Sequence, residues 1–437
     1  MSASLTTESK FTCVWHSAWD PTCPGEAKYE HENKRYCVLH FPSKEKSAEF
    51  DKAFQQKVEK KDFNFSHVWF PDVVLLTHFD FSEAVDFSSA TFSAGAYFTG
   101  ANFKVAVDFS GATFGAPVIF LRATFNLPAD FTDATFSKLA DFNSVTFSGA
   151  ADFTDATFIK AADFRNATFI KTADFSGATF GERTFFSSAT FEDYVKFAQK
   201  KEPVFGQTSS LDLQFVRIEK PEHILFHSLS LHPHWFVNAD PRKFDFIDVV
   251  WSNIGKVRPE IELLKSKLIS SHHRLLAISC RRLAANAEEN DRYREASHLR
   301  RMAMDAERLE TWRGFGFIHL SWWYWLASGY GERVLQAFLV LLGIWLVAGL
   351  LYTCVGFARW EPKLATESDV VSTKRDEVGA PLKLSRALAY SAAVMTLQKP
   401  EPRPATTAAQ TVVLLETILG PVQAALLALA IRRKFMR

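Results

Sequence analysis

The chain is poor in cysteine, tyrosine and net charge, and each shortage excludes a class of protein. Its 437 residues include 5 Cys, too few for a secreted scaffold held together by disulfides. Lys plus Arg number 50 and Asp plus Glu number 49, and this net charge of +1 argues against a dedicated nucleic-acid binder. Residues 1–10 contain no apolar run, so we expect no signal peptide and a cytosolic N-terminal part.

Phenylalanine is abundant where tyrosine is scarce, with 42 Phe against 9 Tyr. From Phe81 to Phe197, 22 Phe follow spacings that alternate strictly between 6 and 5 residues. A fixed period of this kind indicates a solenoid. Two residues before 20 of these 22 Phe stands a small residue, Ala in 15 cases and Val in five. In an extended segment these two side chains face inward together, and the Asp or Thr between them faces water.

The run Ala-Asp-Phe-Ser-Gly-Ala-Thr-Phe at 173–180, with a variant at 107–114, resembles the pentapeptide-repeat family. The resemblance implies a right-handed quadrilateral β-helix over residues 79–199, with Phe stacked inside. This chain inserts one residue at every second step. We therefore expect about 22 residues per coil, with two ordinary and two enlarged corners. The predicted divisions are 1–45 (Cys/His segment), 46–78 (linker and N-terminal cap), 79–199 (solenoid), 200–257 (irregular cap), 258–312 (helical hairpin) and 313–437 (membrane module).

A coil of this length stacks five aspartates in one outer column: Asp86, Asp108, Asp130, Asp152 and Asp174. One interpretation is a strip that binds cations or mimics DNA. The other is that the carboxylates accept backbone N–H groups at the corners, as Asp commonly does in turns. We favour the second, because the solenoid is only mildly acidic.

The first 45 residues contain a candidate metal site in a segment too short to bury a core of its own. The two-residue gap between Cys37 and His40 lets both side chains reach one tetrahedral ion. This Cys-x-x-His pair resembles a small knuckle found before pentapeptide repeats. We expect structural zinc, and the alternative is a set of ordinary cytosolic thiols. The candidate ligands are Cys13, Cys23, Cys37 and His40, with His16 as a competitor.

Residues 258–312 are rich in Leu, Ala, Arg and Glu, which favours helices. Ala296, Leu299, Ala303 and Ala306 share one helical face. The stretch from Tyr293 resembles half of a tetratricopeptide-like helix pair. The hairpin could bind a partner; we favour a packing spacer or an oligomerisation element.

Two apolar segments predict a membrane protein. The first, 334–357, is 24 residues without charge, about 36 Å as a helix and long enough to cross a bilayer. The second, about 406–431, ends in a basic tail that favours a cytosolic C-terminus. We expect two spans in the inner membrane of a cell, both termini cytosolic, and a homo-oligomer. An interfacial aromatic belt precedes the first span: Trp322, Trp323, Tyr324, Trp325 and Tyr330.

The two spans and the short stretch at 382–397 between them resemble the two-span module of bacterial potassium channels. A potassium filter needs a Gly-rich run, and no Gly occurs between Gly379 and Gly420. Glu416 is the one acid in the second span, and Gly420 and Gln423 share its helical face. We hold two interpretations of Glu416 equal: a pore-lining or gating acid, and an interhelical hydrogen bond inside an oligomer.

The sequence contains no nucleophile motif or Gly-rich phosphate loop that would indicate an enzyme. Our first hypothesis is a non-enzymatic membrane protein whose cytosolic solenoid binds an unidentified protein. The alternative is a channel-like protein or sensor, in which the two-span module forms an oligomeric pore without a potassium-type filter.

Overall fold

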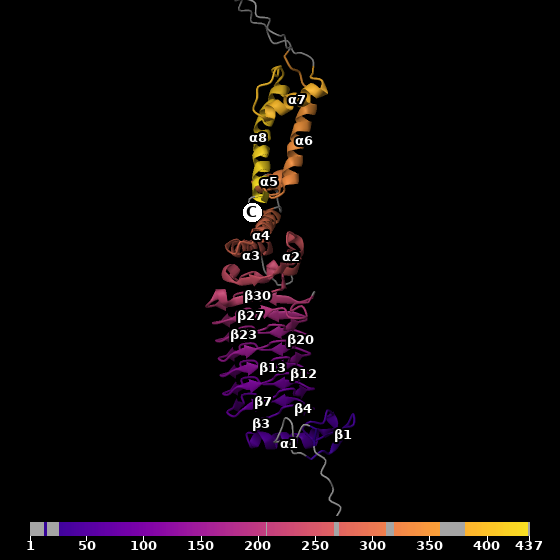
Figure 1. Cartoon of the computed structure of the whole chain (residues 1–437), viewed down its shortest axis with the longest axis vertical. Coiled ribbons are helices and arrows are strands. Elements are labelled where there is room, and N and C mark those ends of the chain that lie inside the picture. Colours follow the sequence, from indigo (N-terminus) through magenta and orange to yellow (C-terminus); the bar gives the residue numbers. More distant parts are fainter. Residues whose placement is uncertain are drawn as a thin grey trace, which may run out of the picture. The chain divides into compact units, whose positions relative to one another are not determined.

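The computed structural model describes residues 13–14, 26–206, 208–265, 271–311, 319–358 and 381–435. The chain divides into two compact units, one of residues 1–292 with 298–303 and the other of 293–297 with 304–437. The first unit contains a β-solenoid (Figure 1, indigo to magenta), and the second contains the two long apolar helices α6 and α8.

The solenoid is a stack of coils whose short strands form four parallel sheets, here called faces 1 to 4 in chain order. In the regular coils each residue pairs with its equivalent in the next repeat: Val107 pairs with Ala129, and Asp108 with Asp130. The longest face has nine strands. The predicted solenoid and its predicted coil length are therefore confirmed.

The strands of the four faces are as follows. Face 1 holds β3 (Phe63–Asn64), β7 (Val85–Asp86), β11 (Val107–Asp108), β15 (Ala129–Asp130), β19 (Ala151–Asp152), β23 (Ala173–Asp174), β27 (Val195–Ala198), β30 (Ile224–His227) and β32 (Asp245–Ile247). Face 2 holds β4 (Trp69–Phe70), β8 (Thr91–Phe92), β12 (Thr113–Phe114), β16 (Thr135–Phe136), β20 (Thr157–Phe158) and β24 (Thr179–Phe180). Face 3 holds β5 (Val74–Leu75), β9 (Ala96–Tyr97), β13 (Val118–Ile119), β17 (Ala140–Asp141), β21 (Ala162–Asp163), β25 (Arg183–Phe185) and β28 (Ser210–Asp212). Face 4 holds β6 (Asp80–Phe81), β10 (Asn102–Phe103), β14 (Thr124–Phe125), β18 (Thr146–Phe147), β22 (Thr168–Phe169), β26 (Thr190–Phe191) and β29 (Arg217–Ile218).

Columns of stacked phenyl rings fill the solenoid. Phe142 is fully buried, and its ring lies 5.0 Å from Phe120 and 4.9 Å from Phe164, with planes 9° and 4° apart. Its edges meet Phe131 and Phe153 at nearly right angles. Such offset and edge-to-face contacts each add about 0.5–1.5 kcal/mol beyond area burial. A tyrosine hydroxyl in this column would lack a partner, which explains why the repeat uses Phe.

Two kinds of corner alternate around each coil, which accounts for the two alternating Phe spacings. At the shorter corner the backbone turns tightly: Ala134 N–H donates to the Phe131 carbonyl at 3.1 Å, and Asp133 between them has a φ of 56°. Small or polar residues that tolerate this left-handed conformation recur there at a constant interval. They are His67, His78, Ser89, Gly100, Gly111, Arg122, Asp133, Ser144, Asp155, Asn166, Gly177 and Ser188.

The parallel ladders extend beyond the predicted limits of residues 79 and 199. They begin at β3 and end at β33 (Val250–Trp251), which pairs with β31 (Ser230–Leu231). The later coils lose the period because their lengths change. The coil from Val195 to its partner Ile224 is longer than a regular coil, and the next, from Leu225 to its partner Asp245, is shorter. Most of the predicted irregular cap, 200–257, is thus irregularly sized coils of the solenoid.

Short elements close both ends of the solenoid. Before it come β1 (Tyr29–His31), β2 (Lys34–Tyr36), η1 (Lys44–Lys46) and α1 (Ser47–Glu59). Within the last coils lie η2 (Pro221–His223), η3 (Pro233–Phe236) and η4 (Pro241–Lys243), followed by α2 (Val257–Lys265) and α3 (His272–Glu289). From α3, the Ser279 hydroxyl donates to the Pro233 carbonyl at 2.7 Å, and the Asn286 amide donates to the Phe244 carbonyl at 2.7 Å. Helix α3 therefore covers the last coil.

The helices that follow are α4 (Tyr293–Thr311), α5 (Leu320–Ser328), α6 (Val334–Tyr352), α7 (Leu384–Met395) and α8 (Thr407–Phe435). On α4 the predicted face of Ala296, Leu299, Ala303 and Ala306 is buried. Helices α6 and α8 lie side by side (Figure 1) and are long and apolar enough to cross a membrane. The helix of the first predicted span ends at Tyr352, before the predicted limit of 357.

Candidate functional site

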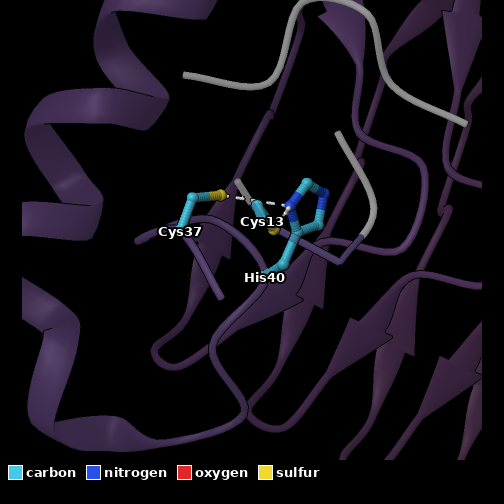
Figure 2. Close-up of side chains that lie close together, drawn as sticks. All are labelled: Cys13, Cys37 and His40. Carbon is cyan, nitrogen blue, oxygen red and sulfur yellow. Dashed lines mark hydrogen bonds between the residues drawn. The ribbon is translucent and has the colours of Figure 1, made fainter. Parts of the chain in front are cut away.

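Cys13, Cys37 and His40 converge at the N-terminal end of the chain (Figure 2). The Nδ1 atom of His40 lies 3.5 Å from the Cys13 sulfur and 3.1 Å from the Cys37 sulfur, and all three side chains are buried. Cys23 and His16, the other predicted ligand and its competitor, lie outside the described residues. The structure therefore brings together three of the four predicted metal ligands.

The geometry of this cluster fits a zinc ion. With Zn–S bonds of ~2.3 Å and Zn–N bonds of ~2.0–2.1 Å, sulfur and nitrogen ligands of a tetrahedral ion lie about 3.5 Å apart. The other ring nitrogen, Nε2, lies 3.2 Å from the Ser66 carbonyl and can donate to it. That hydrogen bond selects the tautomer in which Nδ1 has a lone pair for a metal. Three protein ligands and a fourth from Cys23 would make a closed, structural site.

The electrostatics of His40 also suit a cation. Burial alone would lower the pKa of His40, but its hydrogen bonds to Cys13 and Cys37 outweigh burial and raise the pKa to about 9. The two sulfurs thus favour positive charge at Nδ1. A metal ion bound there would supply that charge and displace the proton.

Lys46 ties this segment to the first coil of the solenoid. It is buried, its Nζ donates to the Leu39 carbonyl at 2.7 Å, and it lies over the rings of Phe50 and Trp69. Burial lowers the pKa of Lys46 to about 7, although the nearby Cys37 and Cys13 oppose this shift. The backbone N–H of Trp69 donates to the same Leu39 carbonyl at 3.1 Å, so that the first coil and the Cys/His segment are joined at Leu39.

The aspartate column of face 1 caps the corners. The Oδ1 atom of Asp108 accepts the Ser110 N–H at 2.7 Å, and that of Asp152 accepts the Thr154 N–H at 2.9 Å. The same bond forms at the other members of the column, Asp86, Asp130 and Asp174. This geometry supports the favoured interpretation of the column, in which its carboxylates serve the turns.

Face 3 differs from the other faces on its outer side. Its first three strands present Leu75, Tyr97 and Ile119 where faces 1 and 2 present mainly Asp and Thr. Leu75 is 69% exposed and Tyr97 is 37% exposed. The same ladder continues with Asp141 and Asp163. We call Leu75, Tyr97, Ile119, Asp141 and Asp163 the face-3 column: its first three members are apolar and the next two acidic. Asp163 is paired with Arg165, and beyond it the ladder continues with Phe185.

A second cluster, which the sequence did not predict, joins α2 to the last coils. Glu260 on α2 is fully buried; its Oε1 lies 2.8 Å from His232 Nδ1, and its Oε2 lies 2.7 Å from His234 Nδ1. Burial would raise the pKa of Glu260, but the hydrogen bonds of His232 and His234 bring it to about 2. The only signal in the sequence was a His-Pro-His run shortly before a helix, a pattern that surface histidines share.

The distances in this second cluster are those of hydrogen bonds. Two nitrogen or oxygen ligands of a tetrahedral zinc ion would lie about 3.3 Å apart, since each bond is ~2.0–2.1 Å long. The carboxylate also accepts the Asn253 amide at 2.9 Å and the His234 backbone N–H at 3.1 Å. Glu260 therefore has four donors, as a buried carboxylate requires, and it fastens α2 to the solenoid.

Glu416 lies buried between three helices of one chain. Its Oε2 accepts the Tyr352 hydroxyl of α6 at 2.5 Å, and its Oε1 accepts the Ser391 hydroxyl of α7. Gln423 is also buried, and its amide donates to the carbonyls of Ala327 and Ala337. Glu416 thus makes interhelical hydrogen bonds within a single chain. Neither interpretation of the sequence had named Tyr352 or Ser391 as its partners.

The third residue of the predicted face, Gly420, allows α7 to approach α8 closely. A Cβ at Gly420 would lie 3.0 Å from Met395 Cγ, and one at Gly349 of α6 would lie 2.6 Å from the Leu388 side chain. Small residues at helix interfaces in membranes serve this purpose. Helix α7 therefore sits against both long helices.

Helix α7 enters and leaves the module at the same end. It starts beside Tyr352, whose carbonyl accepts the Leu382 N–H at 3.4 Å, and Leu388 accepts the Trp345 indole N–H at 3.0 Å. Trp345 lies about two turns before Tyr352, roughly 10 Å along the helix. After Met395 the chain returns, so that the Arg403 carbonyl accepts the Ala358 N–H at 2.8 Å. The segment thus enters the helical bundle and leaves it on the same side, as a re-entrant segment would in a membrane.

Comparison with known proteins identifies the repeat. Residues 76–124 and 120–168 match the family described as pentapeptide repeats (9 copies). No curated protein matches the chain, and no solved structure matches it. The matched residues belong to the regular coils of the four faces. Residues 76–168 of the β-solenoid therefore carry pentapeptide repeats.

Proposed function

We propose that the chain is a non-enzymatic integral membrane protein that presents its solenoid in the cytosol as a platform for protein interaction. Helices α6 and α8 support the membrane part. Only 17% of each apolar window is buried, whereas the core helix of a soluble protein is mostly buried. Their exposed side chains include Leu335, Leu339, Leu414 and Ile418, which suit a lipid environment.

The face-3 column is the single observation that carries the interaction part. Leu75 and Tyr97 are exposed at strand positions that faces 1 and 2 fill mainly with Asp and Thr, and solenoids use such extended surfaces for binding. Burial raises the pKa of Asp141 more than its hydrogen bond from the Asn143 N–H lowers it, while Asp163 raises the pKa and Arg165 lowers it. A cation from a partner would favour the charged form of Asp141. We expect a protein segment that is apolar opposite Tyr97 and basic opposite Asp141.

Photo-crosslinking in cells tests this platform. p-Benzoylphenylalanine in place of Tyr97 should give a discrete protein adduct, and the same group in place of Thr91, in the same coil on face 2, should give none. Asp141→Lys, combined with the probe at 97, should reduce the yield of the adduct. Equal adducts at both positions, or none at either, would reject the platform.

We further propose that Cys13, Cys37 and His40, with Cys23, hold a structural zinc ion. When bound, zinc would crosslink the N-terminal segment to the first coil through His40 and Ser66. The purified full-length protein should contain about one zinc per chain, and Cys37→Ser should lose it, whereas Cys354→Ser should retain it. Equal zinc content in the two variants would contradict the site.

The re-entrant α7 favours a second candidate function, a channel-like protein or sensor. A short helix that enters between two spans and returns on the same side is the arrangement in which channels place their pore-lining backbone. The segment after Met395 contains Lys399 and no Gly, so that a potassium filter is excluded by sequence. Ion flux into liposomes decides between the two functions. Flux that Glu416→Gln alters would support the channel, and no flux with folded protein would exclude it.

A further inference from the structure

Helix α5 exposes an apolar face that its own unit does not cover. Leu320, Trp323 and Leu326 follow one another at every third position and are 82%, 54% and 37% exposed. Side chains with this spacing lie on the same side of a helix, so they form one surface, the α5 face. A soluble protein rarely leaves a tryptophan and two leucines together in water.

The C-terminal end of α5 is fixed to both long helices. The Gln336 amide on α6 donates to the carbonyls of Trp325 and Leu326, both at 2.8 Å. The Gln423 amide on α8 donates to the next carbonyl, that of Ala327, at 2.7 Å. These bonds satisfy the last carbonyls of α5, which would otherwise need water. Helix α5 is therefore held at the end of the module where α6 begins and α8 ends.

The turn from α5 into α6 keeps α5 from continuing along the span. Three consecutive residues, Gly329, Tyr330 and Gly331, have φ values of 53°, 64° and 73°. The Tyr324 hydroxyl donates to the Tyr330 carbonyl at 2.9 Å, and the Arg433 guanidinium donates to the same oxygen at 3.0 Å. A left-handed turn fastened in this way changes the direction of the chain abruptly.

Cationic side chains accompany the α5 face at this end. Arg333 precedes α6 and Arg432 lies in the last turn of α8, and both are exposed. Arg308 of α4 lies over the Trp325 ring at 4.4 Å, on the side away from the α5 face. Tryptophan and arginine together are typical of the layer where lipid headgroups meet acyl chains.

We propose that α5 lies in the headgroup layer of the membrane, with the α5 face toward the acyl chains and Arg333 and Arg432 at the phosphates of anionic lipids. The inference rests on the two spans proposed above. Leu335 of α6 is 69% exposed and precedes Gln336, whose amide donates to the carbonyl of Leu326 on the α5 face. Exposed leucines of α5 and of the proposed span therefore lie near one another, which favours lipid over a second protein as the cover of the α5 face.

Tryptophan quenching in proteoliposomes tests the position of α5. Phosphatidylcholine brominated near the headgroup, at acyl carbons 6 and 7, should quench Trp323. The Trp323→Phe variant should lose at least about twice as much of the bromolipid-quenchable fluorescence as the Trp325→Phe variant. Trp325→Phe is the matched control, because Trp325 is on the same helix but lies beneath Arg308. Aqueous iodide should quench Trp323 weakly.

Trp345, inside the proposed first span, separates failure of this inference from failure of the spans. If deep bromolipid quenches Trp345 while iodide alone quenches Trp323, α5 lies outside the membrane and the inference is overturned. If neither tryptophan is quenched by bromolipid, the spans fail as well. Quenching of both in the expected layers supports both proposals.

The lipid preference provides an independent readout. The double variant Arg333→Gln/Arg432→Gln should retain less phosphatidylglycerol relative to phosphatidylcholine when purified in nanodiscs of both lipids. We expect a loss of about fivefold per arginine, the factor that corresponds to ~1 kcal/mol per charge at an anionic surface. The control Arg122→Gln/Arg217→Gln, on exposed arginines of the solenoid, should leave the ratio unchanged. Equal ratios in the two double variants would overturn the role of the arginines.

Discussion

The solenoid and the helices of the second unit contrast in how they hold themselves together. In the solenoid, each coil repeats the same small set of contacts: stacked Phe rings inside and capped corners outside. In the α6–α7–α8 bundle, single polar side chains join helices that are far apart in sequence. Glu416 meets Tyr352 and Ser391, and Gln423 meets the carbonyls of Ala327 and Ala337.

The proposed membrane location of the bundle accounts for this difference. In water, burial of Phe is itself favourable, so a repeated apolar residue suffices and hydrogen bonds only need to be satisfied. In lipid, burial of an apolar side chain against another gains little, and packing of small residues and interhelical hydrogen bonds must select the neighbours. Substitutions should therefore act through lost burial in the solenoid and through lost polar bonds in the bundle.

Truncation of a core ring should have the largest effect. Phe142→Ala removes a fully buried ring that contacts six others, and it should lower the free energy of unfolding of the solenoid by about 3–5 kcal/mol. Phe142→Leu should cost less than half as much, because it keeps most of the volume. Urea denaturation followed by the circular dichroism of the strands measures both, and equal losses would contradict the role of stacked rings.

Acid should weaken the attachment of α2 to the solenoid. The pKa of Glu260 is about 2 when folded, below its usual 4.5, so its contribution to stability is complete above pH 4.5 and disappears as the pH falls toward 2. A shift of this size corresponds to about 3 kcal/mol. The difference in unfolding free energy between the wild type and Glu260→Gln should therefore shrink between pH 5 and 2.5. The same difference at both pH values would refute the ion-pair account of Glu260.

Loss of the polar hub in the helical bundle should have a moderate effect. Glu416→Ala removes two interhelical hydrogen bonds, each about 0.6 kcal/mol on average in membrane proteins and at most about 1.7. We expect the bundle to lose about 1–2 kcal/mol in a denaturation series with sodium dodecyl sulfate. Gln410→Ala, at an exposed position of the same helix, should have no effect. An equal loss of stability in that variant would contradict the claim that the hydrogen bonds of Glu416 stabilise the bundle.

A single corner carboxylate should have the smallest effect. Asp152→Ala removes the acceptor of the Thr154 N–H and should cost about 1 kcal/mol, since water can replace part of the bond. Asp152→Asn keeps an oxygen acceptor at the same position and should cost a few tenths. A loss of stability as large as that of Phe142→Ala would contradict the account in which the aspartate column only caps the turns.

The regular coils could be predicted because each repeat shows the same pattern of Phe and small residues. The alternating Phe spacings predicted the coil length, and the small residue before each Phe predicted the inward face. The later coils could not be predicted, since the inserted residues between Val195 and Ile224 remove the period while the strands still pair. A ladder needs only backbone groups in register, so it tolerates sequences that have lost the repeat.

The candidate sites were predictable in part, for a related reason. The gap from Cys37 to His40 is local and visible in sequence, and the structure places the predicted ligand Cys13 beside them. The partners of Glu416 lie 25 and 64 residues away along the chain, at Ser391 and Tyr352. The approach of His234 to Glu260 depends on where α2 packs. Contacts that arise from tertiary packing produce no regular residue spacing in the sequence, so they could not be predicted from it.

The most direct test of a membrane-anchored solenoid compares two cysteines in intact cells. Cys354 is exposed and lies just after α6, and Asp108→Cys would place a thiol on the solenoid. A membrane-impermeant maleimide should label Cys354 from outside and should reach position 108 only after the cells are permeabilised, in protein that resists carbonate extraction. Release by carbonate, or labelling of both positions from the same side, would contradict a cytosolic solenoid anchored by two spans.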